Sequence, residues 1–444
     1  MPQPWPLLTV DAGFATATPG LGGTELLLDD PARGLLDTAT LGTVTDWTPL
    51  GGYIGDTPII QSVTITRPST RQQGPLVTYD AGTCTVTLAN SDGRFSPENL
   101  AGPYVTGGVS QIRPMVPLRV RATWAAVTYD LFSGYVRSWT PPTALNGPDY
   151  DYTVAAAQDP FCILEGVTLP AAGAVGAGEL SGARVRRILT AAGWYDAAQG
   201  GSVLDAGQSA VQAATFGDTA LNLLRTAAQS EIGDLYCDGA GRVVFRDRDA
   251  PMTATRSSTV QGVFGDMPGT AQTAGPELPY EDLTRPDDDT MLANDIQATI
   301  AGSSNMQQAK DAASIAKYLF PRSYPATGLI LQNDADALNW ATYVLSISRG
   351  DESRFDQLTL SGDTDPASLY PHLLGRDIGD RIQVWRRPPG TAPITKDCFI
   401  RSVTHTITVD RWETVWGLQN AARYSFLVLD HPVLGQLDAN AVNF

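Results

Sequence analysis

The sequence carries one β pattern twice, which constrains the chain to fold around two related β units. The first copy occupies residues 117–122, 131–139 and 149–159, and the second occupies residues 380–385, 398–406 and 411–420. Each copy is predicted to form a short alternating strand, a longer second strand and a closing strand. Internal duplication is the first interpretation, and chance resemblance between short β segments is the alternative.

Two short matches support the duplication. The second strand of each copy has Phe and Val four residues apart, Phe132 with Val136 and Phe399 with Val403. Because side chains alternate along a strand, the two members of each pair are predicted to share one face. Each closing strand also contains a Thr-Val step, at 153–154 and at 414–415.

Length and charge exclude several classes of protein. The 444 residues suffice for roughly three domains. A net charge of −17 argues against a protein that grips nucleic acid or an anionic membrane. No stretch reaches the roughly 18 apolar residues that span a bilayer, so no membrane segment is predicted. The N-terminus lacks a basic, apolar leader, so we expect synthesis in the cytoplasm and a soluble or particle-borne protein.

The composition of successive segments suggests a mainly β fold with an α+β insert between two β domains. The expected divisions are an N-terminal arm or β extension at 1–55, a first β domain at 56–160, an α+β insert at 161–250, a linker or long loop at 251–290, a second β domain with helices at 291–424, and a tail at 425–444. Within the insert, one helix should end at Gly193 and a second should be capped by Asp218 or Thr219. A hairpin turning at Asp238-Gly239 should follow.

The sequence predicts no catalytic, metal or cofactor site. The histidines His372, His405 and His431 have no metal-ligand spacing to other ligands, and His405 reads as a structural residue within a strand. Four scattered cysteines, without a C-x-x-C, indicate reduced and buried thiols. The acidic run 287–289 reads as a solvated loop rather than a cation site.

Residues 89–100 are predicted to form a tight turn. Asn90, Asp92 and Gly93 resemble the start of a calcium loop, but no acid follows at the required spacing. We expect Asp92-Gly93 to reverse the chain, Phe95 to fill a core and Pro97 to set the exit.

This turn and the segments after it resemble the minor tail proteins of long-tailed actinobacterial phages, over roughly residues 55–424. The matching positions are Leu88, Asn90, Asp92, Gly93, Phe95, Pro97, Pro114, Pro117, Val120, Phe132, Gly134, Val136, Asp377, Ile378, Gly379, Asp380, Val403 and His405. The segment 314–322 departs from the family pattern, and the N-terminal arm has no counterpart.

The resemblance implies a baseplate hub, built from two tube-like β domains of barrel or sandwich type. Such a hub would be a homotrimer at the virion tail tip, assembled in the host cytoplasm, that adapts a sixfold tail tube to a threefold tip. The implied partners are the distal tail protein ring, the C-terminus of the tape-measure protein and downstream tail-tip or receptor-binding proteins. DNA would be only a transient passenger, and neither a cofactor nor an enzymatic activity is implied.

The negative charge suggests that acidic side chains face the channel and repel passing DNA, with simple solubility as the alternative. Three other functions remain open. One is a hexameric distal tail protein, and another is a tail-associated cell-wall hydrolase, for which the chain leaves little room after the second copy. The third is a glycan-binding module, suggested by Trp139, Trp385, Trp412 and Trp416, although Trp in strands more often lies in a core.

Overall fold

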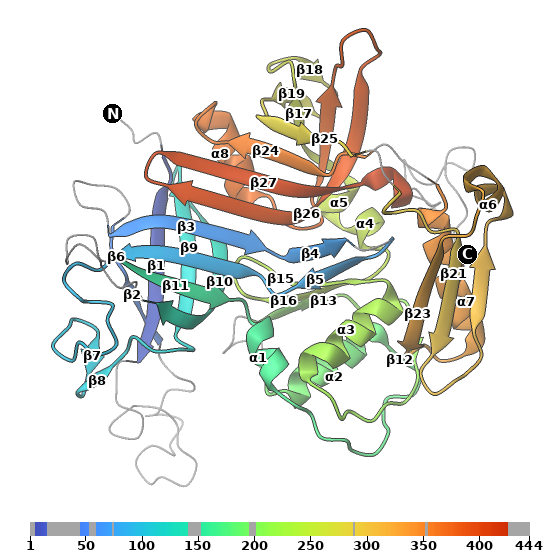
Figure 1. The fold of residues 1–444 in the computed structure, drawn as a ribbon, viewed down its shortest axis with the longest axis horizontal. Helices are drawn as coiled ribbons and strands as arrows, with labels where there is room; N and C mark the ends of the chain where they lie inside the picture. The colour runs from blue at the N-terminus through green and yellow to red at the C-terminus, as the bar shows by residue number, and fades with distance from the viewer. Residues whose placement is uncertain are drawn as a thin grey trace.

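The fold is known from a computed structural model that describes residues 5–15, 45–52, 59–72, 75–140, 152–194, 201–286, 289–350 and 354–424. It is mainly β, with helices distributed around the strands (Figure 1). Among the described residues, fifteen strands belong to one continuous sheet. The expected mainly β fold with added helices is therefore confirmed.

Two five-stranded antiparallel units make up most of this sheet. The first contains β3 (Ile60–Arg67), β6 (Thr83–Ala89), β9 (Pro117–Trp124), β10 (Val127–Thr140) and β11 (Tyr152–Gln158). The second contains β20 (Asp282–Thr284), β24 (Gln357–Ser361), β25 (Arg381–Arg386), β26 (Ile394–Thr408) and β27 (Arg411–Asn420).

The two units have one topology. In space the first runs β3-β6-β11-β10-β9 and the second runs β20-β24-β27-β26-β25, with every neighbouring pair antiparallel. The chain visits corresponding strands in the same order. The repeated pattern seen in the sequence thus covers three of five matching strands, and chance resemblance would not produce the other two in the same places.

The units join where β26 of the second pairs with β3 of the first (Figure 1). β26 is long enough to have two neighbours on one edge. Residues 394–399 pair with β25, and residues 403–408 pair with β3. The opposite edge pairs with β27. One strand thereby carries the hydrogen bonding from one unit into the next.

Further strands extend both units. The expected N-terminal extension supplies β1 (Leu7–Ala15) and β2 (Thr45–Pro49), which continue the sheet from β9. β17 (Val260–Gly265), β19 (Gly275–Leu278) and β18 (Ala271–Gln272) continue it from β25. Residues 251–290 were expected as a linker, and this is wrong, because they hold these strands, β20 and the short helices α4 (Ala250–Thr253) and α5 (Thr255–Ser258).

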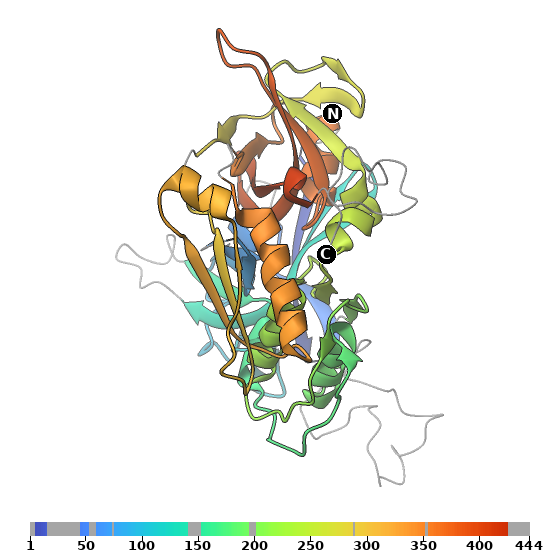
Figure 2. The ribbon, with the colours of Figure 1, turned by 90° about the vertical axis from the view of Figure 1, so that its right-hand side faces the viewer.

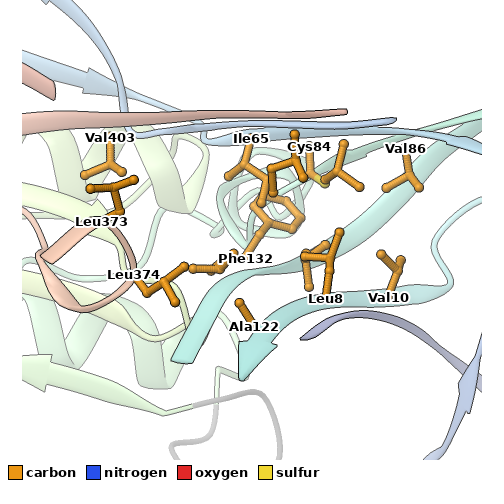
Figure 3. Close-up of a cluster of buried hydrophobic side chains, with 14 of the residues drawn as sticks. Leu8, Val10, Ile65, Cys84, Val86, Ala122, Phe132, Leu373, Leu374 and Val403 are labelled. Atoms are coloured by element: carbon orange, nitrogen blue, oxygen red, sulfur yellow. The ribbon is translucent and has the colours of Figure 1, made fainter. Parts of the chain in front are cut away.

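One apolar core lies between the units. Phe132 of β10 is fully buried there and points toward Ile65 of β3 (Figure 3). Leu373 of α8 (Pro366–Gly375) lies beside Val403, and Leu374 of the same helix lies on the side toward Phe132 (Figure 3). The alternation of apolar residues on β3, β6, β9 and β10 turns one face of each strand into this core. Core packing therefore holds both units together in addition to the strand pairing.

The α+β insert has its own core. Its helices are α1 (Phe161–Gly166), α2 (Ser181–Ala191) and α3 (Ala220–Glu231), and its strands are β12 (Glu179–Leu180), β13 (Ser202–Leu204), β14 (Ala210–Val211), β15 (Asp234–Cys237) and β16 (Val243–Arg246). Both helix predictions are confirmed: α2 is followed by Gly193 at a φ of 73°, and the Thr219 side chain caps α3. All four cysteines are buried and none forms a disulfide, as expected.

The hairpin β15–β16 differs from its prediction. Its loop runs over five residues, 238–242, and the left-handed residue is Gly241 rather than Gly239. The Asp238 carboxylate accepts bonds from the backbone N–H groups of Ala240 and Arg242, at 3.1 and 2.9 Å. This side-chain capping favours the wider loop over a two-residue turn.

A smaller three-stranded sheet stands beside the main one. β21 (Asp295–Ile300), β22 (Gln307–Lys310) and β23 (Ser323–Leu329) are covered by α7 (Asp334–Ser348), while α6 (Ala312–Tyr318) lies at one end (Figure 2). The side chain of Asn333 caps α7 by accepting a bond from the N–H of Asp336. Short pairs β4 (Ser69–Gln72) with β5 (Val77–Asp80) and β7 (Val105–Thr106) with β8 (Val109–Ser110) complete the fold. The tail at 425–444 lies outside the described residues.

Candidate functional site

The two units share a bulged arginine in equivalent strands, β10 and β26. In β10 the register toward β11 slips by one residue at Arg137, and in β26 the register toward β27 slips by one at Arg401. A bulge of this kind places two residues opposite one and redirects the extra side chain. When the two bulges are matched, residues 135–140 align with residues 399–404. This alignment is shifted by three residues from the predicted one, which matched Phe132 with Phe399.

The bulge also corrects the predicted face of the second pair. Phe132 and Val136 share the core face of β10, as predicted. On β26 the extra residue inverts the alternation, so Val403 faces the core, whereas Phe399 points to the opposite face and meets Tyr424 at 5.9 Å between ring centroids. A single inserted residue exchanges the two faces of a strand.

A turn with a left-handed residue precedes β9 in the first unit and β25 in the second. The N–H of Gly379 donates to the carbonyl of Ile400 at 2.8 Å, and the N–H of Met115 donates to the carbonyl of Val136 at 2.6 Å. Their φ angles are 86° and 64°. The turn at 377–380, whose residues are among those of the family resemblance, therefore has a counterpart in the first unit that carries no glycine.

A side-chain cap follows the closing strand in both units. Asp159 accepts a bond from the N–H of Phe161 at 3.0 Å, and Asn420 accepts one from the N–H of Ala422 at 3.0 Å. Each cap opens a short helical segment, α1 or the 3₁₀ turn Ala421–Tyr424. Burial raises the pKa of Asp159 to about 7, against the opposing effect of its backbone bonds.

Arg401 is the buried centre of the second unit's junction with the insert. It is 4% exposed, and its guanidinium donates to Asp234 of β15 at 2.5 Å, to Gln419 of β27 at 2.7 Å and to the Tyr79 hydroxyl of β5 at 3.2 Å. Burial is the largest single effect and opposes its charge, but the charge and hydrogen bond of Asp234 together with nearby tyrosines more than offset it, so the pKa of Arg401 is raised. The bulge thus aims one charged side chain at three separate elements.

The turn at 377–380 forms the other wall of this junction. Asp380 is 2% exposed, bonds to Arg256 and lies 3.8 Å from Arg376. Burial raises its pKa to about 6 even though both arginines favour the charged form. Asp377 pairs with the buried Arg67 of β3 at 3.2 Å. Acids and arginines therefore connect this turn to the first unit and to α5.

A cleft of about 540 Å³ separates the hairpin β15–β16 from the turn at 377–380. Its charged lining consists of Asp234, Asp238, Asp377, Asp380, Arg242, Arg246, Arg256 and Arg401. Four acids balance four arginines, and each arginine pairs with a carboxylate. Such a balanced lining suits the joining of two structural elements better than the binding of an anion or cation.

The first unit's arginine has a different environment. Arg137 is exposed, and among the described residues no carboxylate pairs with it. Its side chain lies near the Cys162 thiol of α1. Cys162 corresponds in position to Arg423 of the second unit. The two bulges are thus equivalent in backbone but opposite in burial.

The turn at 89–100 is built as expected. Gly93 has a φ of 69°, and Phe95 is fully buried between Tyr104 and Trp139. The Asn90 amide accepts from the N–H of Phe95 at 2.8 Å, which holds that ring in place. Asp92 is exposed and forms an ion pair with Arg94, Leu88 is buried at the end of β6, and Pro97 is half-buried.

His405 is a structural residue, as predicted. It is 1% exposed, and its Nδ1 lies 2.9 Å from the Thr414 hydroxyl of β27. Burial, followed by the nearby charge of Arg67, lowers its pKa to about 3, so the ring is neutral at physiological pH. A neutral, buried imidazole packed edge-on against Trp412 has no access to a substrate.

The residues carried over from the resemblance do not converge on one site. Leu88, Phe132, Gly134 and Val136 lie in or beside the core of the first unit, whereas Asp377, Gly379 and Asp380 border the cleft. The sequence analysis missed Arg401 and its partners Asp234 and Tyr79. The sequence does carry a signal for Arg401: an Arg-Ser pair directly follows an apolar residue in both copies, at 137–138 and at 401–402.

Little in the junction suits catalysis or sugar binding. Trp412 and Trp416 are fully buried, and Trp139 uses its indole N–H on the carbonyl of Arg113 at 2.9 Å. In the described part of the chain, no three His, Cys, Asp or Glu side chains form a metal site. Over the same residues, no helix is long and apolar enough to span a membrane. Asp287 and Asp288 lie outside the described residues.

Known structures share this fold. No protein-family model matches the sequence, and a search of curated proteins found no match. The 43 kDa tail protein of prophage MuSo2 from Shewanella oneidensis aligns over 94% of this chain and 98% of its own, with a TM-score of 0.53 and 11% identity. A tail protein from Neisseria meningitidis MC58 aligns over 82% and 92%, with a TM-score of 0.51 and 12% identity. The chain therefore shares its fold with these two tail proteins.

Proposed function

We propose that this chain is a structural protein of a phage tail: the homotrimeric hub at the tail tip of a long-tailed phage. The observation that carries the proposal is the pair of five-stranded units with one topology, in a fold shared with two tail proteins. The junction around Arg401, rich in paired charges and without a reactive constellation, supports a structural rather than an enzymatic role.

The duplication gives a physical reason for a trimer. A sixfold tail tube offers six equivalent contacts to whatever closes its end. Three chains with two similar units each present six near-equivalent surfaces while keeping a threefold axis for the tip beyond. The distal tail protein ring and the end of the tape-measure protein would meet the sixfold side, and receptor-binding proteins would meet the threefold side.

In this role the protein forms part of the channel through which DNA leaves. The net charge of −17 fits a wall that repels phosphate and so keeps passage fast. The same charge would also keep a large protein soluble. The potential of the channel wall in the assembled tip separates these two explanations.

A threefold-averaged cryo-electron microscopy reconstruction of the tail tip tests the proposal. We expect three copies, each with both five-stranded units around the central channel. Six copies would make the protein the distal tail ring instead, and its absence from the particle would end the structural role. A neutral or basic channel wall would contradict the repulsion of DNA.

A further inference from the structure

A pocket of about 190 Å³ lies where four parts of the chain meet. Its walls come from β5, from α3 and β15 of the insert, from β23 of the smaller sheet, and from Tyr424 after β27. Most of the lining is aliphatic or tyrosine, and Leu76, Ile232, Tyr324 and Tyr424 are each half-buried. An apolar surface therefore stays open at this meeting point.

The pocket has the size of one large side chain. An apolar cavity of about 150 Å³ holds a benzene ring, whereas pockets for drug-sized molecules measure about 300–1,000 Å³. The two charged residues of the lining already have partners, because Arg225 pairs with Asp80 at 3.3 Å and Asp234 pairs with Arg401 at 2.5 Å. Size and charge together indicate a phenyl ring rather than an ionic ligand.

The apolar wall is a fixed feature of the fold. Ile232 ends α3 with a φ of 60°, a left-handed conformation that a β-branched residue rarely adopts. It packs with Leu76 and Tyr424 against a small core of the described residues. The next residue, Gly233, accepts no side chain, since a Cβ there would lie 2.5 Å from the carbonyl oxygen of Arg246. An isoleucine thus remains in the pocket wall where glycine would suit the backbone better.

The chain itself supplies an apolar occupant. Tyr424 is the last described residue, and the tail 425–444 follows it, beginning Ser-Phe-Leu-Val-Leu. Phe426 comes two positions after Tyr424, so its Cα lies within about 7 Å of a residue in the pocket wall. We propose that Phe426 fills this pocket of its own chain, and that the tail thereby ties β5, α3, β15 and β23 together.

The point of attachment favours the chain's own tail over a free partner. A short tether gives Phe426 an effective concentration on the order of 1 mM at the pocket. The tail carries Asp430 and Asp438 and neither Lys nor Arg, and the Arg225 side chain at the pocket is 36% exposed, so the charges are complementary. Filling the pocket would also take water from Asp234, whose side chain is 21% exposed, and so strengthen its pair with Arg401.

Amide hydrogen exchange of the full chain tests the contact. Phe426→Ser empties the pocket, and Phe444→Ser, the same change at the far end of the tail, is the matched control. We expect Phe426→Ser to speed exchange in β5, β15 and the last turn of α3 by about tenfold or more, because a buried phenyl ring is lost, and to leave β1 and β2 unchanged. The control should match wild type. Equal exchange in all three proteins, or a loss outside the pocket walls, overturns the contact.

A labelled peptide of residues 425–444 gives the sharper result. At concentrations up to about 1 mM it should bind the full-length Phe426→Ser chain but not wild type, whose own tail holds the pocket. A peptide that itself carries Phe426→Ser should bind neither. A wild-type peptide that binds both chains equally, or neither, overturns the proposal. Wild-type protection that falls on dilution also overturns it, because a second copy's tail then fills the pocket. None of these results changes the copy number expected in the tail tip, so the hub proposal is tested separately.

Discussion

Replacing Arg401 by methionine should uncouple the insert from the second unit. Methionine keeps most of the side-chain volume, so the change removes charge and hydrogen bonds without opening a large cavity. It leaves Asp234 without its partner at 2.5 Å, and Gln419 and Tyr79 without the guanidinium that they contact. The loss should be felt first in β15, which carries Asp234.

The expected cost is about 3 kcal/mol. Removing one member of a buried ion pair typically costs 3–5 kcal/mol, because the remaining charge stays desolvated. Arg401 is 4% exposed, but the Asp234 side chain keeps 21% exposure, so water partly solvates the abandoned carboxylate and places the cost at the lower end. Arg137→Met is the matched control, since it sits on the same bulge but is exposed, and it should cost less than about 0.5 kcal/mol.

Amide hydrogen exchange of the monomeric chain is the suitable assay, because several cores make a single unfolding transition unsafe to assume. Arg401→Met should lower the protection of β15 and β16 while leaving β21–β23 unchanged. Equal effects of the two substitutions, or a loss spread evenly over all strands, would refute the view that burial of Arg401 makes the junction.

Three further outcomes are expected from local geometry. Gly134→Ala should lower the amide-exchange protection of β10 and β11 by about 2–3 kcal/mol, because its Cβ would overlap a main-chain oxygen of β11. Gly173→Ala, with open space around it, should be neutral or slightly stabilising. Changing Ala125 to Asn together with Ala126 to Gly should raise the amide-exchange protection of the β9–β10 hairpin by about 1–2 kcal/mol, because both alanines of its turn have positive φ. On acidification from pH 7.5 to 5, the free energy that protects β26 from exchange should fall by about 2 kcal/mol relative to His405→Gln, because the unfolded imidazole takes up a proton near pH 6.5 while the folded one, with a pKa of about 3, does not.

Patterns that depend on neighbouring residues were predictable. The alternation in β3 and β6, the cap at Thr219, the glycine after α2 and the buried ring of Phe95 all arise from interactions within a few positions of the chain. The hairpin at 234–246 was predictable as an element, but its loop was not, because the Asp238 side chain bonds two backbone groups that a sequence pattern does not reveal.

Long-range pairing was not predictable in the same way. A bulge exists only relative to the partner strand, so the slip at Arg401 and the outward turn of Phe399 could not be read from residues 394–408 alone. The strands in 251–290 are short and rich in Gly, and they gain their order by adding to β25 and β24. Their sequence therefore resembled a linker.

By itself, the sequence determined that the chain is mainly β and that a β pattern occurs twice. Only the tertiary structure decided that each unit has five strands, that β26 joins β3 and that one of two equivalent arginines is buried and the other is exposed. The reason is physical: alternation and capping are set by adjacent residues, whereas the burial of Arg401 and the pairing of β26 with β3 depend on partners more than a hundred residues away.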